Sequence, residues 1–222
     1  MTRQHWRGAN LLNPLPVVLV SCTDENGKSN VMTAAWTGTI CSDPVMVSVS
    51  IRKSRFSHDI IAKTKEFVLN LPNEDLVLFT DYVGIYSGKK VDKFNLPGKY
   101  KVTAIESEKV NAVTIDECPI ALECKVKDIL ELGSHDCFIA EVVSCSIDDK
   151  YLDKDNKLDF KKANLISYCH GEYYTLGKKI GKFGYSSKKK ERSRRNNTIN
   201  KNKRKKTIIK LIKENKYVIR CL

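Results

Sequence analysis

The stretch that decides the fold is residues 30–61, NVMTAAWTGTICSDPVMVSVSIRKSRFSHDII. Within it, 45–51 alternates valine with methionine and serine, which is typical of a strand with one buried face. A helix is predicted over 58–65, with Ser57 as its N-cap and Asp59 in the first turn, where a negative charge suits the helix dipole. The stretch therefore predicts strands followed by a basic turn and a helix.

The flanking sequence supplies more short strands than helices. The apolar run at 16–22 and the turn residues of 23–29 predict a hairpin with 30–36. The other predicted elements are a strand at 66–72, a short helix at 73–83 capped by Asn73, a surface excursion at 84–100, and strands at 120–132 and 137–147 around a turn at 133–136. Since no regular β-α-β alternation appears, the pattern favours a mainly β fold with helical insertions, as in a closed or nearly closed antiparallel barrel.

Neither a membrane span nor a secretory signal is predicted. No apolar run approaches the roughly 20 residues that a spanning helix needs, and the N-terminus lacks the apolar block of a signal peptide. The eight cysteines include no C-x-x-C motif, so we predict that they form no metal site. We expect them to be small buried hydrophobic residues, with Cys41 as a packed thiol. We expect a soluble, cytoplasmic protein.

The net positive charge of the chain comes entirely from its C-terminal residues. Residues 188–222 hold 15 of the 39 lysines and arginines but 2 of the 26 acidic residues, which leaves 24 of each sign in 1–187. We predict a domain over 1–187 and a basic, disordered tail over 188–222. The tail could bind nucleic acid or an anionic surface, although Tyr217 is its one aromatic residue. The alternatives are a solvated tail and the product of a shifted reading frame.

The basic turn has the groups that a phosphate requires. Arg52, Lys53 and Arg55 supply charge, Ser54 and Ser57 supply hydroxyl donors, and a helix start supplies free amides. A solvated turn before a capped helix is the alternative.

The preceding strand adds an apolar slot. Thr33, Ala34 and Ala35 are small enough to let a flat ligand approach the backbone, and Trp36 offers an aromatic wall. Here the alternative is that these residues are ordinary core.

Six segments together resemble the flavin reductase-like family, whose members adopt the FMN-binding split barrel and include flavoredoxins. They are NPLPVVLVSC (13–22), the stretch 30–61, EFVLNLP (66–72), SGKKVDKF (87–94), LGSHDCFIAEV (132–142) and YYTLGKKIGKFGYS (173–186). The resemblance covers roughly residues 10–187. It implies a homodimer that holds FMN near the subunit interface.

The resemblance also implies roles for individual residues. Thr33, Ala34, Ala35 and Trp36 would lie along the flavin ring and ribityl chain, Ser50, Ile51 and Arg52 would continue the site, and Arg55 and Ser57 would hold the phosphate, with Lys53, His58 and Lys93 as further candidates. Lys93 could come from the second subunit. His135 matches a histidine near the flavin and nicotinamide, so we take it as a candidate for nicotinamide positioning. A polar turn residue bonded to nearby backbone is the alternative.

The implied activity is electron transfer from NAD(P)H to flavin or a flavin-linked acceptor. Hydride passes directly from nicotinamide to flavin, so no acid, base or nucleophile is demanded of the protein. No G-x-G-x-x-G or Walker A motif is present, and NAD(P)H would bind transiently. The alternative is a flavoredoxin-type carrier that a protein partner reduces.

Overall fold

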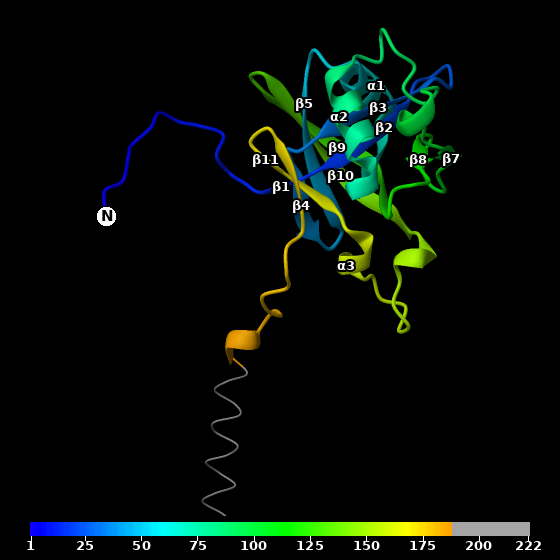
Figure 1. Ribbon diagram of the computed structural model, residues 1–222. Helices are drawn as coiled ribbons and strands as arrows, with labels where there is room; N and C mark the ends of the chain where they lie inside the picture. The colour runs from blue at the N-terminus through cyan, green and yellow to red at the C-terminus, as the bar shows by residue number, and fades with distance from the viewer. Residues whose placement is uncertain (188–222) are drawn as a thin grey trace, which may run out of the picture. The chain divides into compact units, whose positions relative to one another are not determined.

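The computed structural model describes residues 1–187, and β-strands dominate it (Figure 1). A seven-stranded antiparallel sheet has the order β3-β2-β6-β9-β10-β5-β4. Its strands are β2 (Val18–Thr23), β3 (Ser29–Ala34), β4 (Thr37–Ser42), β5 (Val45–Arg52), β6 (Glu66–Leu71), β9 (Ile120–Leu132) and β10 (His135–Ile147). The prediction of a mainly β fold is confirmed.

Smaller elements surround this sheet. They are the sheet of β1 (Leu15–Pro16), β11 (Ile166–Cys169) and β12 (Glu172–Thr175), the pair β7 (Ala104–Glu106) and β8 (Val113–Ile115), the helices α1 (Phe56–Thr64), α2 (Val77–Ile85) and α3 (Phe160–Ala163), and 3₁₀ turns at Glu74–Leu76, Gly98–Tyr100 and Asp149–Tyr151. No helix within residues 1–187 is long and apolar enough to cross a membrane.

Strand β2 is buried along its whole length because core side chains pack against both of its faces. Val18, Val20 and Cys22 face the larger core, which α1 enters with Ile60 and Ile61. The alternate residue Leu19 faces a second core that α2 supplies with Phe79, Val83 and neighbouring residues. Successive strand side chains point to opposite faces, so one strand organises both cores and fixes α1 and α2 on opposite sides of the sheet.

Several local predictions were wrong. Helix α1 begins at Phe56 with Arg55 as its N-cap residue, and Ser57 lies in the first turn, where its hydroxyl accepts a hydrogen bond from Asn30 instead of capping the helix. Asn73 precedes a 3₁₀ turn without a side-chain cap bond. The excursion at 84–100 is not wholly on the surface, since Lys93 is buried.

The chain divides into a compact unit at Met1–Leu176 and a second unit that begins at Gly177. Of the second unit the structure describes 177–187, which contain a turn at 183–184 and helical residues at 185–187. The predicted boundary at Ser187 therefore lies inside this second unit. The predicted basic tail at 188–222 lies outside the described residues.

Candidate functional site

Two adjoining cavities open beside β3 and β5, and three residues, Met32, Arg52 and Arg55, line both. The first, of about 280 Å³, is called the basic cavity. It is lined by Asn30, Met32, Arg52, Ser54, Arg55, Phe56, Ser57, Tyr86, Ser87, Gly88 and Lys93, which include three cations and no carboxylate. The second, of about 360 Å³, is called the aromatic cavity and has Trp36, His135, Tyr168 and Tyr173 in its wall.

Lys93 is the most unusual side chain of the basic cavity, since it is only 3% exposed. Its Nζ donates to the carbonyl oxygens of Val31 at 2.7 Å and Val83 at 2.8 Å. Burial, reinforced by the charge of Arg55, lowers the pKa of Lys93 to about 8. Among residues 1–187 no carboxylate pairs with this amine or with Arg55. The cavity thus concentrates positive charge that the described chain does not neutralise.

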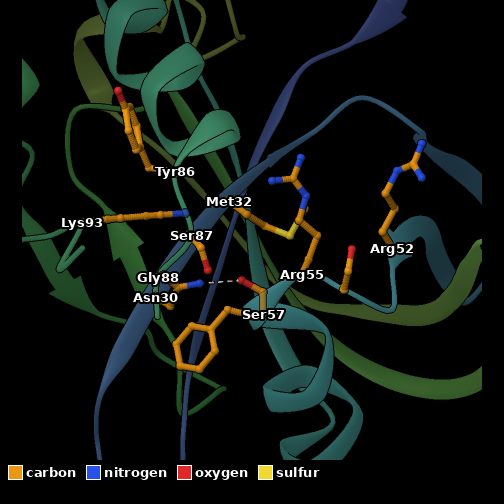
Figure 2. A pocket seen from close by; sticks show the side chains of 11 residues that line it. Asn30, Met32, Arg52, Arg55, Ser57, Tyr86, Ser87, Gly88 and Lys93 are labelled. Atoms are coloured by element: carbon orange, nitrogen blue, oxygen red, sulfur yellow. Dashed lines mark hydrogen bonds between the residues drawn. The ribbon is translucent and has the colours of Figure 1, made fainter. Parts of the chain in front are cut away.

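Arg55 and Ser57 reach the same cavity from the start of α1 (Figure 2). The guanidinium of Arg55 donates through Nη1 to the carbonyl of Gly84 at 2.8 Å, which uses one of its five N–H donors. Asn30 Nδ2 donates to the Ser57 hydroxyl at 2.7 Å, so Ser57 accepts in this bond and its own proton is not used in it. Lys93 approaches from the opposite side in Figure 2. These groups can surround a small anion.

The Gly88 backbone packs closely against two side chains that also line the basic cavity. A Cβ at Gly88 would lie 2.1 Å from Asn30 Oδ1 and 2.7 Å from the ring of Phe56, both shorter than any real contact. A side chain at position 88 would therefore force Asn30 or Phe56 to shift, so glycine suits the place where the segment after α2 passes β3 and the start of α1. The Ser87–Gly88 backbone is held directly beside the anion-binding groups.

The aromatic cavity has four aromatic side chains in its wall, and a carboxylate, Asp81, lines it together with Arg52 and Arg55. The ring centroids of Trp36 and His135 lie 4.7 Å apart, with an interplanar angle of 35°. Burial, with a smaller contribution from Arg52, lowers the pKa of His135, so its ring is neutral over more of the physiological range. Ser134 Oγ lies 2.8 Å from His135 Nδ1. A cavity with aromatic side chains in its wall suits a planar ring.

The short side chains of 33–35 line the aromatic cavity on the side of β3. Thr33 donates its hydroxyl proton to the carbonyl of Thr80 in α2, which anchors β3 to that helix. Ser50 donates its backbone N–H to the Trp36 carbonyl at 2.8 Å, which holds β5 beside the break between β3 and β4. Backbone bonds therefore fix both edges of the slot.

The structure brings most of the predicted site residues together. Ten of them line one or both cavities: Thr33, Ala34, Ala35, Trp36, Ser50, Arg52, Arg55, Ser57, Lys93 and His135. Ile51 instead lies fully buried in the larger core. Lys53 points elsewhere, because its amine pairs with Glu131 at 3.1 Å and Asp136 at 3.3 Å. His58 is bound between two carboxylates and does not line either cavity.

Several lining residues were not predicted. Asn30, Met32, Phe56, Tyr86, Ser87 and Gly88 complete the basic cavity, and Val17, Asp81, Gly84, Ile85, Tyr168 and Tyr173 complete the aromatic one. Tyr173 donates its hydroxyl proton to Asp81 at 3.3 Å, and burial followed by the Asp81 charge raises the pKa of Tyr173 to about 12. A Ser-Gly pair after a predicted helix was the one local signal in this set.

Comparisons with known proteins agree with this geometry. The fold and site define a mainly β protein in which an aromatic slot adjoins an unneutralised basic cavity. Residues 11–177 match the flavin reductase like domain, and the chain belongs to this family.

Named relatives are similar over most of the chain. Flavoredoxin of Desulfovibrio vulgaris is 31% identical, with a TM-score of 0.75 over 82% of this chain and 97% of its own. A flavoredoxin from Methanosarcina acetivorans is also 31% identical, with a TM-score of 0.75 over 83% and 99%. An uncharacterized protein of Archaeoglobus fulgidus is 33% identical over 74% of this chain and 89% of its own.

The residues present fit a flavin mononucleotide. A phosphate monoester carries close to two negative charges at neutral pH, and the basic cavity offers Arg55, the Ser57 hydroxyl and an amine that no carboxylate in residues 1–187 neutralises. The adjoining slot offers a flat aromatic wall for a ring system. Arg55 lines both cavities, so one elongated ligand could occupy the two at once.

Proposed function

We propose that this protein binds FMN across the two cavities and passes electrons from NAD(P)H to flavin or to a flavin-linked acceptor. The observation that carries the proposal is the buried Lys93 amine beside Arg55, without a carboxylate partner in residues 1–187, at one end of a cavity whose other end is aromatic. An uncompensated buried cation is costly. A bound phosphate would remove that cost.

Each part of the site has a distinct task. Arg55, Ser57 and Lys93 hold the phosphate, while Thr33–Trp36, Ser50 and Arg52 border the ribityl chain and ring. Bound FMN supplies the ring that accepts hydride from a nicotinamide. His135 orients the nicotinamide through the neutral ring that stacks near Trp36. The chain itself binds and orients, and it moves no proton.

A second candidate is a flavoredoxin-type carrier that a protein partner reduces. The observation that favours it is the 31% identity to two flavoredoxins over nearly their whole lengths. The two candidates share the FMN site and differ only in the electron donor. A cytoplasmic location belongs to both proposals, since NAD(P)H and reduced redox proteins are found there.

We also propose that the protein is a homodimer with its interface next to this site. Cross-strand partners share a sheet face, and the register places Leu132 opposite His135, which in turn lies opposite Arg52. Leu130 and Leu132 are both about half exposed on this face. Light scattering coupled to gel filtration tests the proposal, and a monomeric mass would contradict it.

The decisive experiment is flavin binding followed by anaerobic reduction. We expect purified protein to be yellow, to lose its oxidised-flavin absorption on extensive dialysis, and to gain thermal stability when FMN is restored, since a ligand bound only by the native state stabilises it. Anaerobic mixing with NADH and with NADPH should bleach the flavin. A colourless protein that FMN does not stabilise contradicts the FMN site, and failure of both nucleotides to bleach bound flavin favours the carrier.

A further inference from the structure

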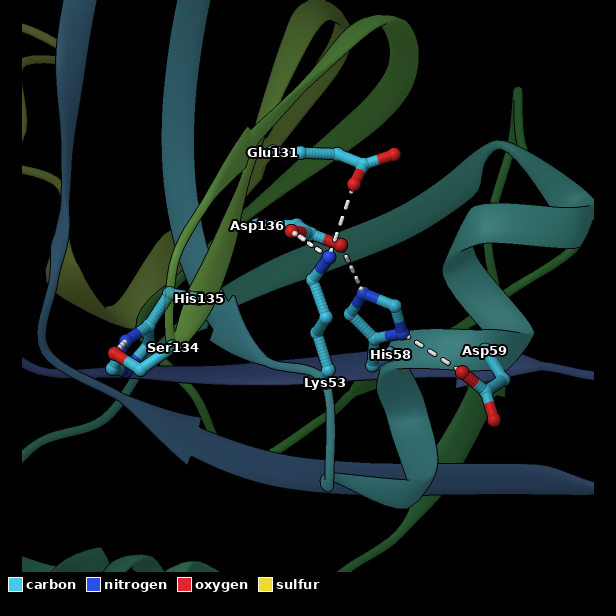
Figure 3. A network of polar contacts seen from close by, with 7 residues as sticks. All are labelled: Lys53, His58, Asp59, Glu131, Ser134, His135 and Asp136. Carbon is cyan, nitrogen blue, oxygen red and sulfur yellow. Dashed lines mark hydrogen bonds and ion pairs between the residues drawn. The ribbon is translucent and has the colours of Figure 1, made fainter.

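A charged network lies behind the wall of the aromatic cavity (Figure 3). Asp136 is only 5% exposed, and its Oδ2 lies 2.8 Å from His58 Nε2. The other ring nitrogen, His58 Nδ1, lies 2.8 Å from Asp59 Oδ1. Lys53 Nζ lies 3.3 Å from Asp136 Oδ1 and 3.1 Å from Glu131. Five charged or titratable side chains thus join the turn after β5, the start of α1 and the β9–β10 hairpin.

Strand geometry places this network directly behind the site. Asp136 pairs with Ile51, while His135 pairs with Arg52 one position along the two strands. Since successive strand residues face opposite sides, Asp136 faces the end of the core that α1 covers, and His135 faces the aromatic cavity. In Figure 3 the side chains of His135 and Ser134 point away from the network.

The two least exposed members of the network, Asp136 and His58, are each the chain neighbour of a cavity residue. Asp136 follows His135, and His58 follows Ser57. The His58 ring is itself held by an edge-to-face contact with the fully buried Phe138, with ring centroids 5.5 Å apart. A displacement of Asp136 or His58 would therefore move a lining residue of one cavity or the other.

We propose that His58 and Asp136 are positioning residues of the candidate site. Their hydrogen bond fixes the start of β10, and with it the His135 ring, against the basic turn at 52–57. Lys53, which lies in the basic turn, adds a second link between the turn and β10 by pairing with the other carboxylate oxygen of Asp136. The inference rests on the proposed function for its ligand, but the contact between Trp36 and His135 can be measured without any ligand.

The direct test is the fluorescence of Trp36 in flavin-free protein. Trp6 is the second tryptophan, so the measurements use a Trp6→Phe background, and His135→Gln identifies the part of the pH titration that comes from His135. A protonated imidazole quenches indole emission more strongly than a neutral one at contact distance. We expect the His135-dependent change to be lost in His58→Ala and Asp136→Asn and kept in His58→Gln, whose amide can still donate to Asp136.

Flavin affinity gives the second readout. We expect His58→Ala and Asp136→Asn to weaken FMN binding by about 3- to 10-fold. The matched control is Lys63→Gln, which breaks the exposed pair between α1 and Glu25 at the far end of the same helix and should alter neither readout. Urea unfolding of each variant measures its stability separately.

Three outcomes separate the possibilities. Loss of both the Trp36 signature and FMN affinity, with recovery in His58→Gln, supports the positioning role. Variants that unfold at lower urea concentration but keep the signature and the affinity overturn it, because the network is then merely structural. If even the parent protein fails to bind FMN, the proposed function fails, while the Trp36 titration still decides whether the network holds His135 in place.

Discussion

Replacing Lys93 by methionine removes the buried charge and keeps an unbranched side chain of similar length. A hydrogen bond to a charged group contributes about 1.5–3 kcal/mol, and each 1.4 kcal/mol is a factor of ten. Because the Lys93 amine is desolvated beside Arg55, we expect the Kd for FMN to rise by about 10- to 100-fold. Riboflavin has the same ring and ribityl chain without the phosphate, so its Kd should change by less than about twofold.

The pH dependence of binding follows from the lowered pKa of Lys93. In flavin-free protein this pKa is about 8, and a bound phosphate would favour the charged amine. Above pH 8 binding must therefore take up a proton, so affinity falls as the pH rises. Affinity also falls below about pH 6, where the phosphate dianion takes up a proton and loses one of its two negative charges. The Lys93→Met variant should lose the alkaline decline and keep the acidic one.

The stability of flavin-free Lys93→Met distinguishes this effect from misfolding. Folding lowers the pKa of Lys93 from 10.5 to about 8, so the unfolded chain holds the proton more tightly and wild-type stability rises with pH across that window. The shift corresponds to about 3 kcal/mol, which methionine recovers. Methionine also leaves the carbonyls of Val31 and Val83 without their donor, at about 1–3 kcal/mol each. These opposing effects should leave the melting temperature within several degrees of wild type.

Isothermal titration with FMN and riboflavin from pH 5 to pH 10 measures these expectations. The matched control is Lys63→Met, which removes an exposed lysine from the end of α1 and should bind both ligands as wild type does. Equal weakening of FMN and riboflavin would show that the substitution damages the cavity without removing a phosphate contact. Unchanged FMN affinity would refute the phosphate assignment outright.

Three further predictions concern stability. Gly88→Ala should lower the free energy of unfolding in urea by about 1–3 kcal/mol, because its Cβ would overlap Asn30 Oδ1. Gly27→Ala is the comparison, since a Cβ there meets no neighbour and the substitution tests backbone strain alone. Asn70→Ala should cost about 2–4 kcal/mol, since its amide serves three buried partners, including the N–H of Ile115 at 2.8 Å. Hydrogen bonds from His58 and Lys53 outweigh the effect of burial and lower the pKa of Asp136. Wild type should therefore lose more stability than Asp136→Asn as the pH falls below about 4, and equal acid sensitivity would contradict this.

The sequence predicts strand β5, whose burial alternates, and misses strand β4, which lies at one edge of the sheet. Strand β5 carries Val47 and Val49 inward and Ser48 and Ser50 outward, so its period is visible in the letters. Strand β4 has no buried residue, and its pairing with β5 depends on backbone bonds and on the Thr37 hydroxyl, which donates to the Ser48 carbonyl at 2.7 Å. No hydrophobic pattern marks such a strand.

The candidate site was predictable from the residues where chemistry is local, whereas Lys93 was a candidate only through the family resemblance and its burial was not predicted. The basic turn and the small residues before Trp36 are adjacent in sequence, so their combination could be recognised. Lys93 lies in a polar, glycine-containing segment, and lysine is almost never fully buried without a partner. Its burial is possible because α2 and β3 each offer a carbonyl that accepts a hydrogen bond from the amine. No residue near Lys93 in the sequence indicates these two acceptors. Tyr168 and Tyr173 were likewise not predictable, because they reach the aromatic cavity from a small separate sheet that is distant in sequence.

The placement of charged side chains, and not their number, makes the basic cavity positive. Residues 1–187 carry equal numbers of basic and acidic side chains, so an unneutralised cation there reflects placement and not composition. Within the basic turn Lys53 takes two carboxylates, whereas Arg52 and Arg55 take none among the described residues. The carboxylates of Glu131 and Asp136 therefore hold the turn in place from behind, and the cations in front stay available. A site whose neighbouring carboxylates hold the turn, while its cations have no carboxylate partner among the described residues, is suited to bind an anion. The phosphate of FMN has the required charge.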